Sequence, residues 1–280
     1  MNQVAQNPIG IFDSGLGGIS VVRAMMELLP DERLIYFGDT ARVPYGSKSN
    51  ETVRRFSRQI VNFLLDHQVK MVVVACNTAS AIALDDLRGR WNLPIIGVIE
   101  PGATAAVNKS PSNRVGVIGT TSTIHSGAYE KALLTRNPNL NIQSKACPLL
   151  VPLVEEGWPE DDVLTGVLER YLSGYKQSPV ESLILGCTHY PYLKEAIQRV
   201  IGPDVNLIDS GEETARMVQD ILIEKSMAHT PVGQDAARKH HFYVSDFPQR
   251  FQETASRFLG RPLENLFRIE LEVLESYSVG

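Results

Sequence analysis

Residues 71–80 read MVVVACNTAS and combine a strand, a cysteine and the start of a helix. The residues before Cys76 are apolar and largely β-branched, which is typical of a buried strand in a parallel sheet. The alanine-rich run over residues 79–84 then has the period and composition of a helix. Cys76 is therefore predicted at the carboxyl end of a strand, the edge where open α/β sheets bind ligands. Because N–H groups at a helix N-terminus stabilise a thiolate, we expect them to lower the pKa of Cys76.

The same arrangement occurs again at residues 182–191, which read SLILGCTHYP. An apolar run again precedes a cysteine and a threonine, and a helix is predicted over residues 193–200. Cys187 follows Cys76 by 111 residues (187 − 76).

Two further landmarks repeat in the same order. Residues 10–14 and 113–123 are both strands that run into small polar residues, at an offset of 106 (116 − 10). Residues 43–46 match residues 151–157 at an offset of 108 (151 − 43). Three landmarks at similar offsets predict a duplicated α/β unit whose two copies bring the two cysteines face to face.

Composition restricts the class of protein. The chain has 280 residues, enough for one large or two ordinary α/β domains, and 43% hydrophobic residues, as in soluble globular proteins. The net charge of −5 argues against a nucleic-acid surface. No apolar run approaches the ~18 residues of a membrane span, and residues 1–8 do not resemble a signal peptide. The three cysteines, an odd number without close spacing, suit a reducing cytosol.

The remaining apolar runs continue an α/β pattern. Strands are predicted at residues 9–12, 34–39, 93–99, 206–210 and 240–244, and helices at residues 19–29, 50–67, 211–227 and 248–259. Residues 229–239 are polar and are predicted to form a surface loop. The adjacent His240 and His241 point to opposite faces of their strand, which argues against a joint metal site.

The glycine-rich residues 13–18 lack both the P-loop and the dinucleotide pattern. We interpret these glycines as allowing the backbone to approach a small anion at the following helix N-terminus. Asp13 is either a helix cap or a group that orients chemistry. Tyr45 lies in a Pro- and Gly-containing loop, where it either packs or binds a ligand.

The cysteines admit several interpretations. Cys147 has apolar neighbours and no matched partner, so we interpret it as a structural residue. A zinc site at Cys187 and His189 would lack the further ligands that zinc requires. A cysteine hydrolase can use Cys187 as nucleophile and His189 as base, but it leaves Cys76 without a role.

Two thiols across one cleft suit stereochemical inversion at an amino acid's α-carbon, with a base on one face and an acid on the other. One thiolate removes the α-proton, and the opposing thiol protonates the planar intermediate. A free thiol, with a pKa of about 8.5, is mostly protonated at neutral pH, so each cysteine needs a polar neighbour. Asp13 can serve Cys76 in this way, and His189, with Glu155 close by, can serve Cys187.

At these residues the chain resembles the glutamate racemases, a cofactor-independent branch of the aspartate/glutamate racemase superfamily. The motifs that carry the resemblance span nearly the whole chain in family order: GIFDSGLGG at 10–18, FGDT at 37–40, PYG at 44–46, ACNTAS at 75–80, GVIEPG at 97–102 and GCTHYP at 186–191. The resemblance implies two α/β domains related by a pseudo-twofold axis, with mainly parallel sheets, helices on both faces and the active site between them. It places residues 1–100 and 210–280 in the first domain and residues 101–209 in the second.

The resemblance also assigns roles to individual positions. Cys76 and Cys187 match the two proton carriers, assisted by Asp13, His189 and Glu155. The matching substrate-binding positions are Asp13, Ser14, Pro44, Tyr45, Gly46, Ser47, Asn77, Thr78, Thr188 and His189, with Thr120 and Thr121 on the corresponding loop of the second half. No metal and no cofactor are expected.

The resemblance also implies a bacterial cytoplasmic enzyme that supplies D-glutamate for peptidoglycan. The enzyme is expected to form a homodimer and to bind neither a membrane nor, directly, a nucleic acid. An aspartate racemase or a related Cys-Cys isomerase remains an alternative on the same scaffold. A binding protein that holds an amino acid without turning it over, and the cysteine hydrolase, are alternatives from other classes.

Overall fold

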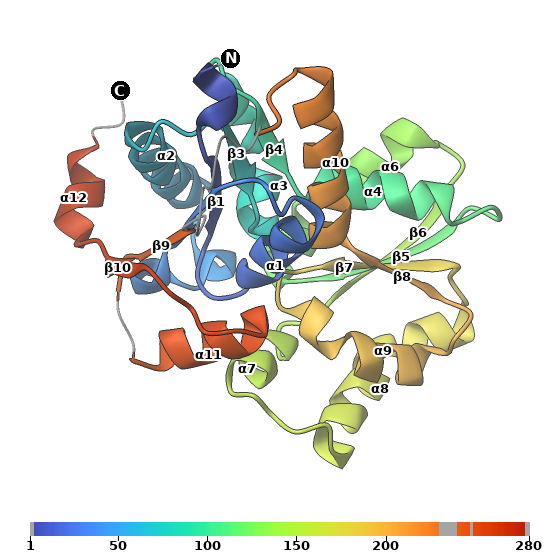
Figure 1. Cartoon of the computed structure of the whole chain (residues 1–280). Coiled ribbons are helices and arrows are strands. Elements are labelled where there is room, and N and C mark those ends of the chain that lie inside the picture. The colour runs from blue at the N-terminus through green and yellow to red at the C-terminus, as the bar shows by residue number, and fades with distance from the viewer. Residues whose placement is uncertain (1–2, 230–239, 247–248, 278–280) are drawn as a thin grey trace.

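The computed structural model describes residues 3–229, 240–246 and 249–277, which form two parallel sheets flanked by helices (Figure 1). The first sheet has six strands in the order β10-β9-β2-β1-β3-β4. They are β1 Ile9–Asp13, β2 Leu34–Gly38, β3 Met71–Val74, β4 Ile95–Gly97, β9 His241–Val244 and β10 Leu266–Arg268. The second sheet has four strands in the order β6-β5-β7-β8. They are β5 Arg114–Gly119, β6 Asn141–Ala146, β7 Ser182–Gly186 and β8 Asn206–Asp209.

The helices cover both faces of each sheet. Those packed on the first sheet are α1 Ile19–Leu28, α2 Asn50–Asp66, α3 Asn77–Arg88, α11 Gln249–Leu259 and α12 Leu271–Ser276. Those packed on the second sheet are α4 Ile99–Asn108, α5 Thr121–His125, α6 Ala128–Arg136, α7 Leu150–Glu155, α8 Asp162–Gln177 and α9 Lys194–Ile201. We call these two groups, each with its sheet, the first half and the second half. Helix α10, Ser210–Glu224, packs against both α1 and α4 and so joins the halves.

Strand order confirms the prediction of two half-copies with parallel sheets. The order β2-β1-β3-β4 in the first half is repeated as β6-β5-β7-β8 in the second. All strand pairings in both sheets are parallel. The strand before each cysteine, β3 or β7, therefore occupies the same place in its sheet, and both cysteines lie at carboxyl edges.

The sequence match between residues 43–46 and 151–157 does not extend to local structure. Residues 45–47 form a short 3-10 turn in a loop, whereas residues 150–155 form helix α7. Both segments nevertheless follow the second strand of their half, so the match marks equivalent positions in the topology.

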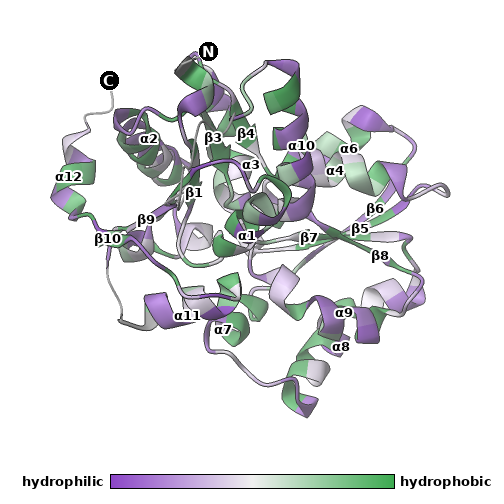
Figure 2. Cartoon of the chain, in the orientation of Figure 1, coloured by the Kyte–Doolittle hydropathy of each residue, from purple (hydrophilic) through white to green (hydrophobic). Residues whose placement is uncertain are grey.

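Apolar burial explains why the halves hold together. All residues of β1, β2 and β3 are buried, as their uninterrupted apolar runs predict. One core lies between β3, β1 and helices α2 and α3, and a larger one runs from α1 and α11 across to α8 and β7 of the second half. Figure 2 shows the hydrophobic strands inside and mixed colours on the outer helices. Among the described residues no helix combines the length and apolarity needed to cross a membrane.

After α10 the chain returns to the first sheet. Strand β9 pairs with β2, and β10 pairs with β9. This return agrees with what the resemblance implies, while the domain bounds themselves stay a prediction. Of the loop predicted at residues 229–239, only His229 lies within the described residues, and it is buried, with its N–H donating to Glu32 Oε1 at 2.8 Å.

Candidate active site

A cavity of about 470 Å³ opens between the two halves at the carboxyl edges of their sheets. Its size is that of a small-molecule site. It is lined by Ser14, Gly15, Leu16, Val43, Pro44, Tyr45, Gly46, Ser47, Cys76, Asn77, Thr78, Thr120, Thr121, Pro148, Val151, Pro152, Glu155, Cys187, Thr188 and His189. Every site residue predicted from the sequence belongs to this lining except Asp13.

Cys76 stands where β3 ends and α3 begins, because its β-branched run stops there and a helix-forming run follows. Its backbone is extended, and its Sγ accepts a hydrogen bond from the Ala79 N–H at 3.5 Å, so it is the N-cap of α3. The thiol lies 3.7 Å from Ser14 Oγ, to which it donates. Only 6% of the residue is exposed, which gives the sulfur contact with the cavity and little with solvent.

The expectation of a lowered pKa for Cys76 is wrong. Burial and then the negative charge of Asp13 raise the pKa of the Cys76 thiol to about 12, and its hydrogen bonds with Ala79 and Ser14 oppose this only in part. Desolvation disfavours the thiolate more than one helix N-terminus stabilises it. Cys76 is therefore a protonated thiol at neutral pH in the ligand-free protein.

Asp13 ends β1 and lies directly behind the cavity wall, with 1% of its surface exposed. Its Oδ2 accepts a hydrogen bond from the Gly15 N–H at 2.9 Å, and its Oδ1 lies 3.5 Å from Thr188 Oγ1 of the other half. Burial raises the pKa of Asp13, and the positive charge of His189 works against that rise. Asp13 thus acts on the cavity through its charge and its neighbours.

The glycines after Asp13 allow close packing. A Cβ at Gly18 would lie 2.4 Å from Asp13 Cβ, and a Cβ at Gly17 would lie 2.2 Å from Thr188 Oγ1 and 2.6 Å from the His189 ring. Gly17 therefore lets the first half approach Thr188 and His189, and Gly18 leaves room for the Asp13 side chain. Gly15 lines the cavity, and the interpretation that the backbone of this turn approaches a small anion stays a prediction.

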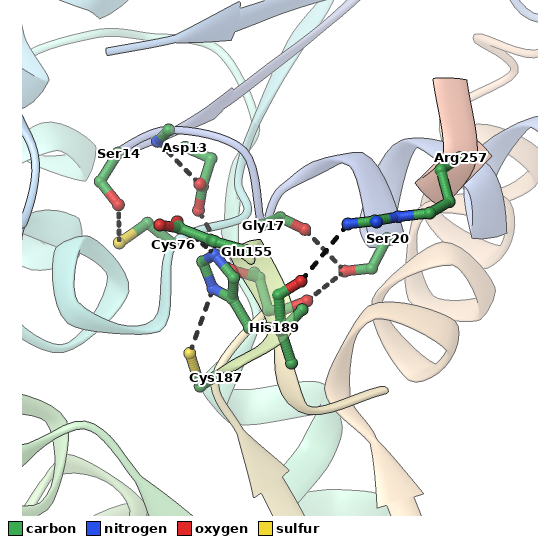
Figure 3. A network of polar contacts seen from close by, with 12 residues as sticks. Asp13, Ser14, Gly17, Ser20, Cys76, Glu155, Cys187, His189 and Arg257 are labelled. Atoms are coloured by element: carbon green, nitrogen blue, oxygen red, sulfur yellow. Dashed lines mark hydrogen bonds and ion pairs between the residues drawn. The ribbon is translucent and has the colours of Figure 1, made fainter. Parts of the chain in front are cut away.

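His189 joins Cys187 to Glu155 in a short chain of contacts (Figure 3). Its Nδ1 lies 3.6 Å from Cys187 Sγ, and its Nε2 lies 2.9 Å from Glu155 Oε1. Burial alone would lower the pKa of His189, but the hydrogen bonds to Cys187 and Glu155 outweigh it and raise the pKa to about 10. The ring is therefore an imidazolium at neutral pH, which places a positive charge beside the Cys187 sulfur.

Two residues of the first half, Ser20 and Arg257, contact backbone carbonyl groups next to His189 and Glu155 (Figure 3). Sequence reasoning missed both. Ser20 Oγ lies 2.9 Å from the Thr188 carbonyl oxygen and 3.0 Å from that of Gly17. Arg257 Nη2 lies 3.5 Å from the Val154 carbonyl oxygen, next to Glu155. Nothing in the local sequence around either residue indicates these contacts, which arise only when the halves pack.

Hydroxyl groups form the wall between α3 and α5. Thr120 is the N-cap of α5 and accepts a hydrogen bond from the Thr123 N–H at 3.2 Å. Thr78 Oγ1 lies 3.2 Å from both Thr120 Oγ1 and Thr123 Oγ1. Two helix N-termini, one from each half, therefore meet at this wall, and such ends favour anionic groups.

Tyr45 both packs and lines the cavity, so the two interpretations given for it are compatible. Its hydroxyl donates to Asp39 Oδ2 at 2.5 Å, and Asp39 is paired with Arg42 at 2.8 Å. The phenol oxygen is thus engaged inside the protein, and Tyr45 contributes to the cavity as a buried part of its lining.

The lining residues that sequence reasoning missed are mostly apolar. They are Gly15, Leu16, Val43, Pro148, Val151 and Pro152. Several of them neighbour or belong to motifs already singled out, and that proximity was the available signal. Within the described residues no group of three or more His, Cys, Asp or Glu is arranged to hold a metal ion.

Comparison with known proteins gives a consistent result. The family model of the Asp/Glu/Hydantoin racemases matches residues 9–218. Glutamate racemase of Geobacter metallireducens is 50% identical over 264 residues, covering 94% of this chain and 97% of the relative. The structure of glutamate racemase from Francisella tularensis in complex with D-glutamate is 39% identical with a TM-score of 0.89, covering 98% and 100% of the two chains. That of glutamate racemase from Thermus thermophilus in complex with β-chloro-D-alanine is 45% identical with a TM-score of 0.85, covering 96% and 99%.

Proposed function

The chain belongs to the Asp/Glu/Hydantoin racemase family, and on that premise we propose that it interconverts L-glutamate and D-glutamate without a cofactor. The observation that carries the proposal is that Cys76 and Cys187 enter one cavity from the two halves, at equivalent strand ends. The relatives named glutamate racemase support glutamate as the substrate.

In the proposed reaction a thiolate on one side removes the α-proton and leaves the electron pair on the substrate as a planar carbanion. The thiol on the other side then donates its proton to the opposite face and becomes a thiolate. One C–H bond breaks and one forms, so atoms and charge balance and no oxidant is needed. The reverse reaction exchanges the two roles.

The neighbouring residues have separate tasks in this mechanism. The His189 imidazolium stabilises negative charge on Cys187, and Glu155 holds the ring by its other nitrogen. The negative charge of Asp13 disfavours the Cys76 thiolate, so Cys76 serves as the thiol that protonates the intermediate.

Substrate recognition follows from the lining. The helix N-termini at Asn77 and Thr121 offer donors to carboxylates, and hydroxyls come from Ser14, Thr78, Thr120 and Thr188. Pro44, Tyr45, Gly46 and Ser47 also belong to the lining, together with apolar residues such as Val43 and Val151. We further propose that the enzyme works in the bacterial cytoplasm as a homodimer and supplies D-glutamate for peptidoglycan.

The test is incubation of the purified protein with L-glutamate, and separately with L-aspartate, in D₂O without added cofactor. Polarimetry reports inversion, and proton NMR reports loss of the α-hydrogen. We expect inversion and α-deuteration of glutamate in step with each other. Glutamate that binds without exchange would support a binding protein, and faster turnover of aspartate would support an aspartate racemase.

Cys147→Ser is the matched control for the cavity cysteines. Cys147 is fully buried, donates to the Lys145 carbonyl oxygen at 3.6 Å and lies outside the cavity lining. This variant is expected to keep the wild-type rate. A covalent acyl-enzyme at Cys187 during turnover would instead support a cysteine hydrolase.

A further inference from the structure

Tyr129 is a buried tyrosine that connects the two halves beside the cavity. It comes from α6 of the second half, yet its hydroxyl donates to Asn77 Oδ1, at the start of α3 in the first half, at 2.6 Å. The hydroxyl also lies 2.8 Å from Ser210 Oγ, on the first residue of α10. The exposed fractions of Tyr129, Asn77 and Ser210 are 2%, 4% and 2%. The contact is therefore shielded from water, where a hydrogen bond costs most to lose.

The direction of each hydrogen bond follows from the inventory of hydrogens. A phenol has one hydrogen to donate, and an amide oxygen can only accept. Tyr129 gives its hydrogen to Asn77 Oδ1, so the Ser210 hydroxyl must donate to the phenol oxygen. Ser210 thus donates to Tyr129, and Tyr129 donates to Asn77, so that Oδ1 of Asn77 is engaged inside the protein.

The other end of the Asn77 amide is left for the cavity. Asn77 belongs to the cavity lining, and no described residue accepts a hydrogen bond from its Nδ2. An amide whose oxygen is engaged presents two N–H donors and no acceptor. Such a group binds a carboxylate and has nothing to offer an ammonium.

The Tyr129 ring lies against two glycines, which have no side chain to displace it. A Cβ at Gly186, directly before Cys187, would lie 3.0 Å from Tyr129 Cε2. A Cβ at Gly102 would lie 2.7 Å from Ser210 Oγ and 3.6 Å from Tyr129 Cε1. Both glycines lie in motifs noted in the sequence for other reasons, and the space they leave is filled by Tyr129 and Ser210.

We propose that Tyr129 is a positioning residue that fixes the Asn77 amide with Nδ2 toward the cavity, so that Asn77 donates to a carboxylate of the substrate. The inference rests on the proposed function, because it assigns a binding task within the same cavity. Tyr129 donates to Asn77, the residue after Cys76, and its ring lies against Gly186, the residue before Cys187. The position of Asn77 in the cavity therefore depends on how the two halves pack.

The test compares Tyr129→Phe with Tyr175→Phe as the matched control. Tyr175 is also a buried second-half tyrosine, with its hydroxyl 3.1 Å from the carbonyl oxygens of Val117 and Gln143, away from the cavity lining. For Tyr129→Phe we expect KM for both enantiomers to rise about tenfold while kcat stays within about threefold, because a binding contact is lost without a change in the proton carriers. Tyr175→Phe is expected to leave both constants unchanged.

A double-mutant cycle separates positioning from general support of the fold. If Tyr129 acts through Asn77, Tyr129→Phe has no further effect on KM in an Asn77→Ala protein. Independent effects that multiply would overturn the proposal. Competitive inhibition by glutarate, which has two carboxylates and no ammonium, is expected to weaken about tenfold in Tyr129→Phe, and an unchanged inhibition constant would also overturn it.

Ser210→Ala provides the second variant if Tyr129→Phe does not fold. It removes the donor to the phenol oxygen and is expected to raise KM about threefold, and wild-type constants would count against the proposal. A wild-type protein that does not turn over glutamate would defeat the proposed function. A Tyr129→Phe protein with the wild-type KM beside an active wild type would defeat this inference alone.

Discussion

Cys76 and Cys187 occupy equivalent strand ends in the two halves of the protein, but the charged groups beside them have opposite signs. Cys76 lies near the buried carboxylate of Asp13, and burial with that charge raises its pKa to about 12. Cys187 lies 3.6 Å from Nδ1 of His189, whose pKa is raised to about 10. The backbone is duplicated, whereas the electrostatic surroundings are not.

This difference gives the two sulfurs different electrostatic surroundings. Burial and the charge of Asp13 disfavour a thiolate at Cys76, whereas the positive charge of His189 lies beside the Cys187 sulfur. The proposed two-base reaction needs a thiol and a thiolate at once, one on each face of the α-carbon. The charges of Asp13 and His189 therefore favour the direction in which Cys187 removes the proton and Cys76 donates one. After one turnover the two sulfurs have exchanged protonation states, as the reverse direction requires.

Removing either sulfur is the largest perturbation of this comparison. Cys76→Ser and Cys187→Ser are each expected to lower the racemisation rate by about 10⁴-fold, because a serine hydroxyl is a far weaker base than a thiolate. Each variant still holds one cavity thiol and can eliminate HX from one enantiomer of a β-substituted glutamate, since elimination needs a single base. Polarimetry measures the first effect and product assays on both enantiomers measure the second. Full racemase activity in either variant would contradict the assignment.

Removing the polar neighbour of one sulfur tests the asymmetry directly. His189→Gln is expected to lower kcat/KM about 10²-fold, because the group that stabilises the Cys187 thiolate loses its charge. The equilibrium constant of a racemisation is one, so kcat/KM must fall equally in both directions. The substrate α-deuterium isotope effect, however, should increase only for the enantiomer whose proton Cys187 removes. An equal increase of the isotope effect for both enantiomers would show that His189 does not act on Cys187 alone.

The same comparison shows which features of the site can be predicted from the sequence. The strand-end positions of Cys76 and Cys187 follow from local patterns of β-branched residues, and the repeat offsets predict that the two edges meet. The contact of Ser20 with the Thr188 carbonyl has no local signature, because the two residues approach only through tertiary packing. The raised pKa of Cys76 escapes the sequence for the same reason, since burial and the position of Asp13 outweigh the local helix N-terminus.

A smaller effect is expected when the charge near Cys76 is removed. Asp13→Asn lowers the pKa of Cys76, because the nearby carboxylate disfavours the thiolate. In a background that carries Cys187→Ser and Cys147→Ser, iodoacetamide should alkylate Cys76 about tenfold faster at pH 8, because a larger fraction of the thiol is ionised. Peptide mass spectrometry follows the reaction. Alkylation no faster than in the parent protein would show that burial alone sets the pKa.

The last expected effect is on stability, and a comparison with His189→Gln isolates the contribution of the second side. The folded protein holds the pKa of His189 at about 10, above the ordinary value of 6.5, so the folded state binds the proton more tightly than the unfolded state. The stability from this proton is fully present below pH 6.5 and is lost as the pH rises from there toward 10.

Urea unfolding between pH 6.5 and 9 therefore distinguishes the wild type from His189→Gln. The free energy of unfolding of the wild type is expected to fall more steeply, by about 1 kcal/mol per pH unit, because only the wild type loses this proton on unfolding. The raised pKa of Cys76 also makes the free energy of unfolding fall as the pH rises. Because Cys76 is present in both proteins, this contribution cancels in the difference between them. Parallel pH profiles for the two proteins would mean that His189 is neutral in the folded state, and the two sides of the cavity would then differ less than their neighbours indicate.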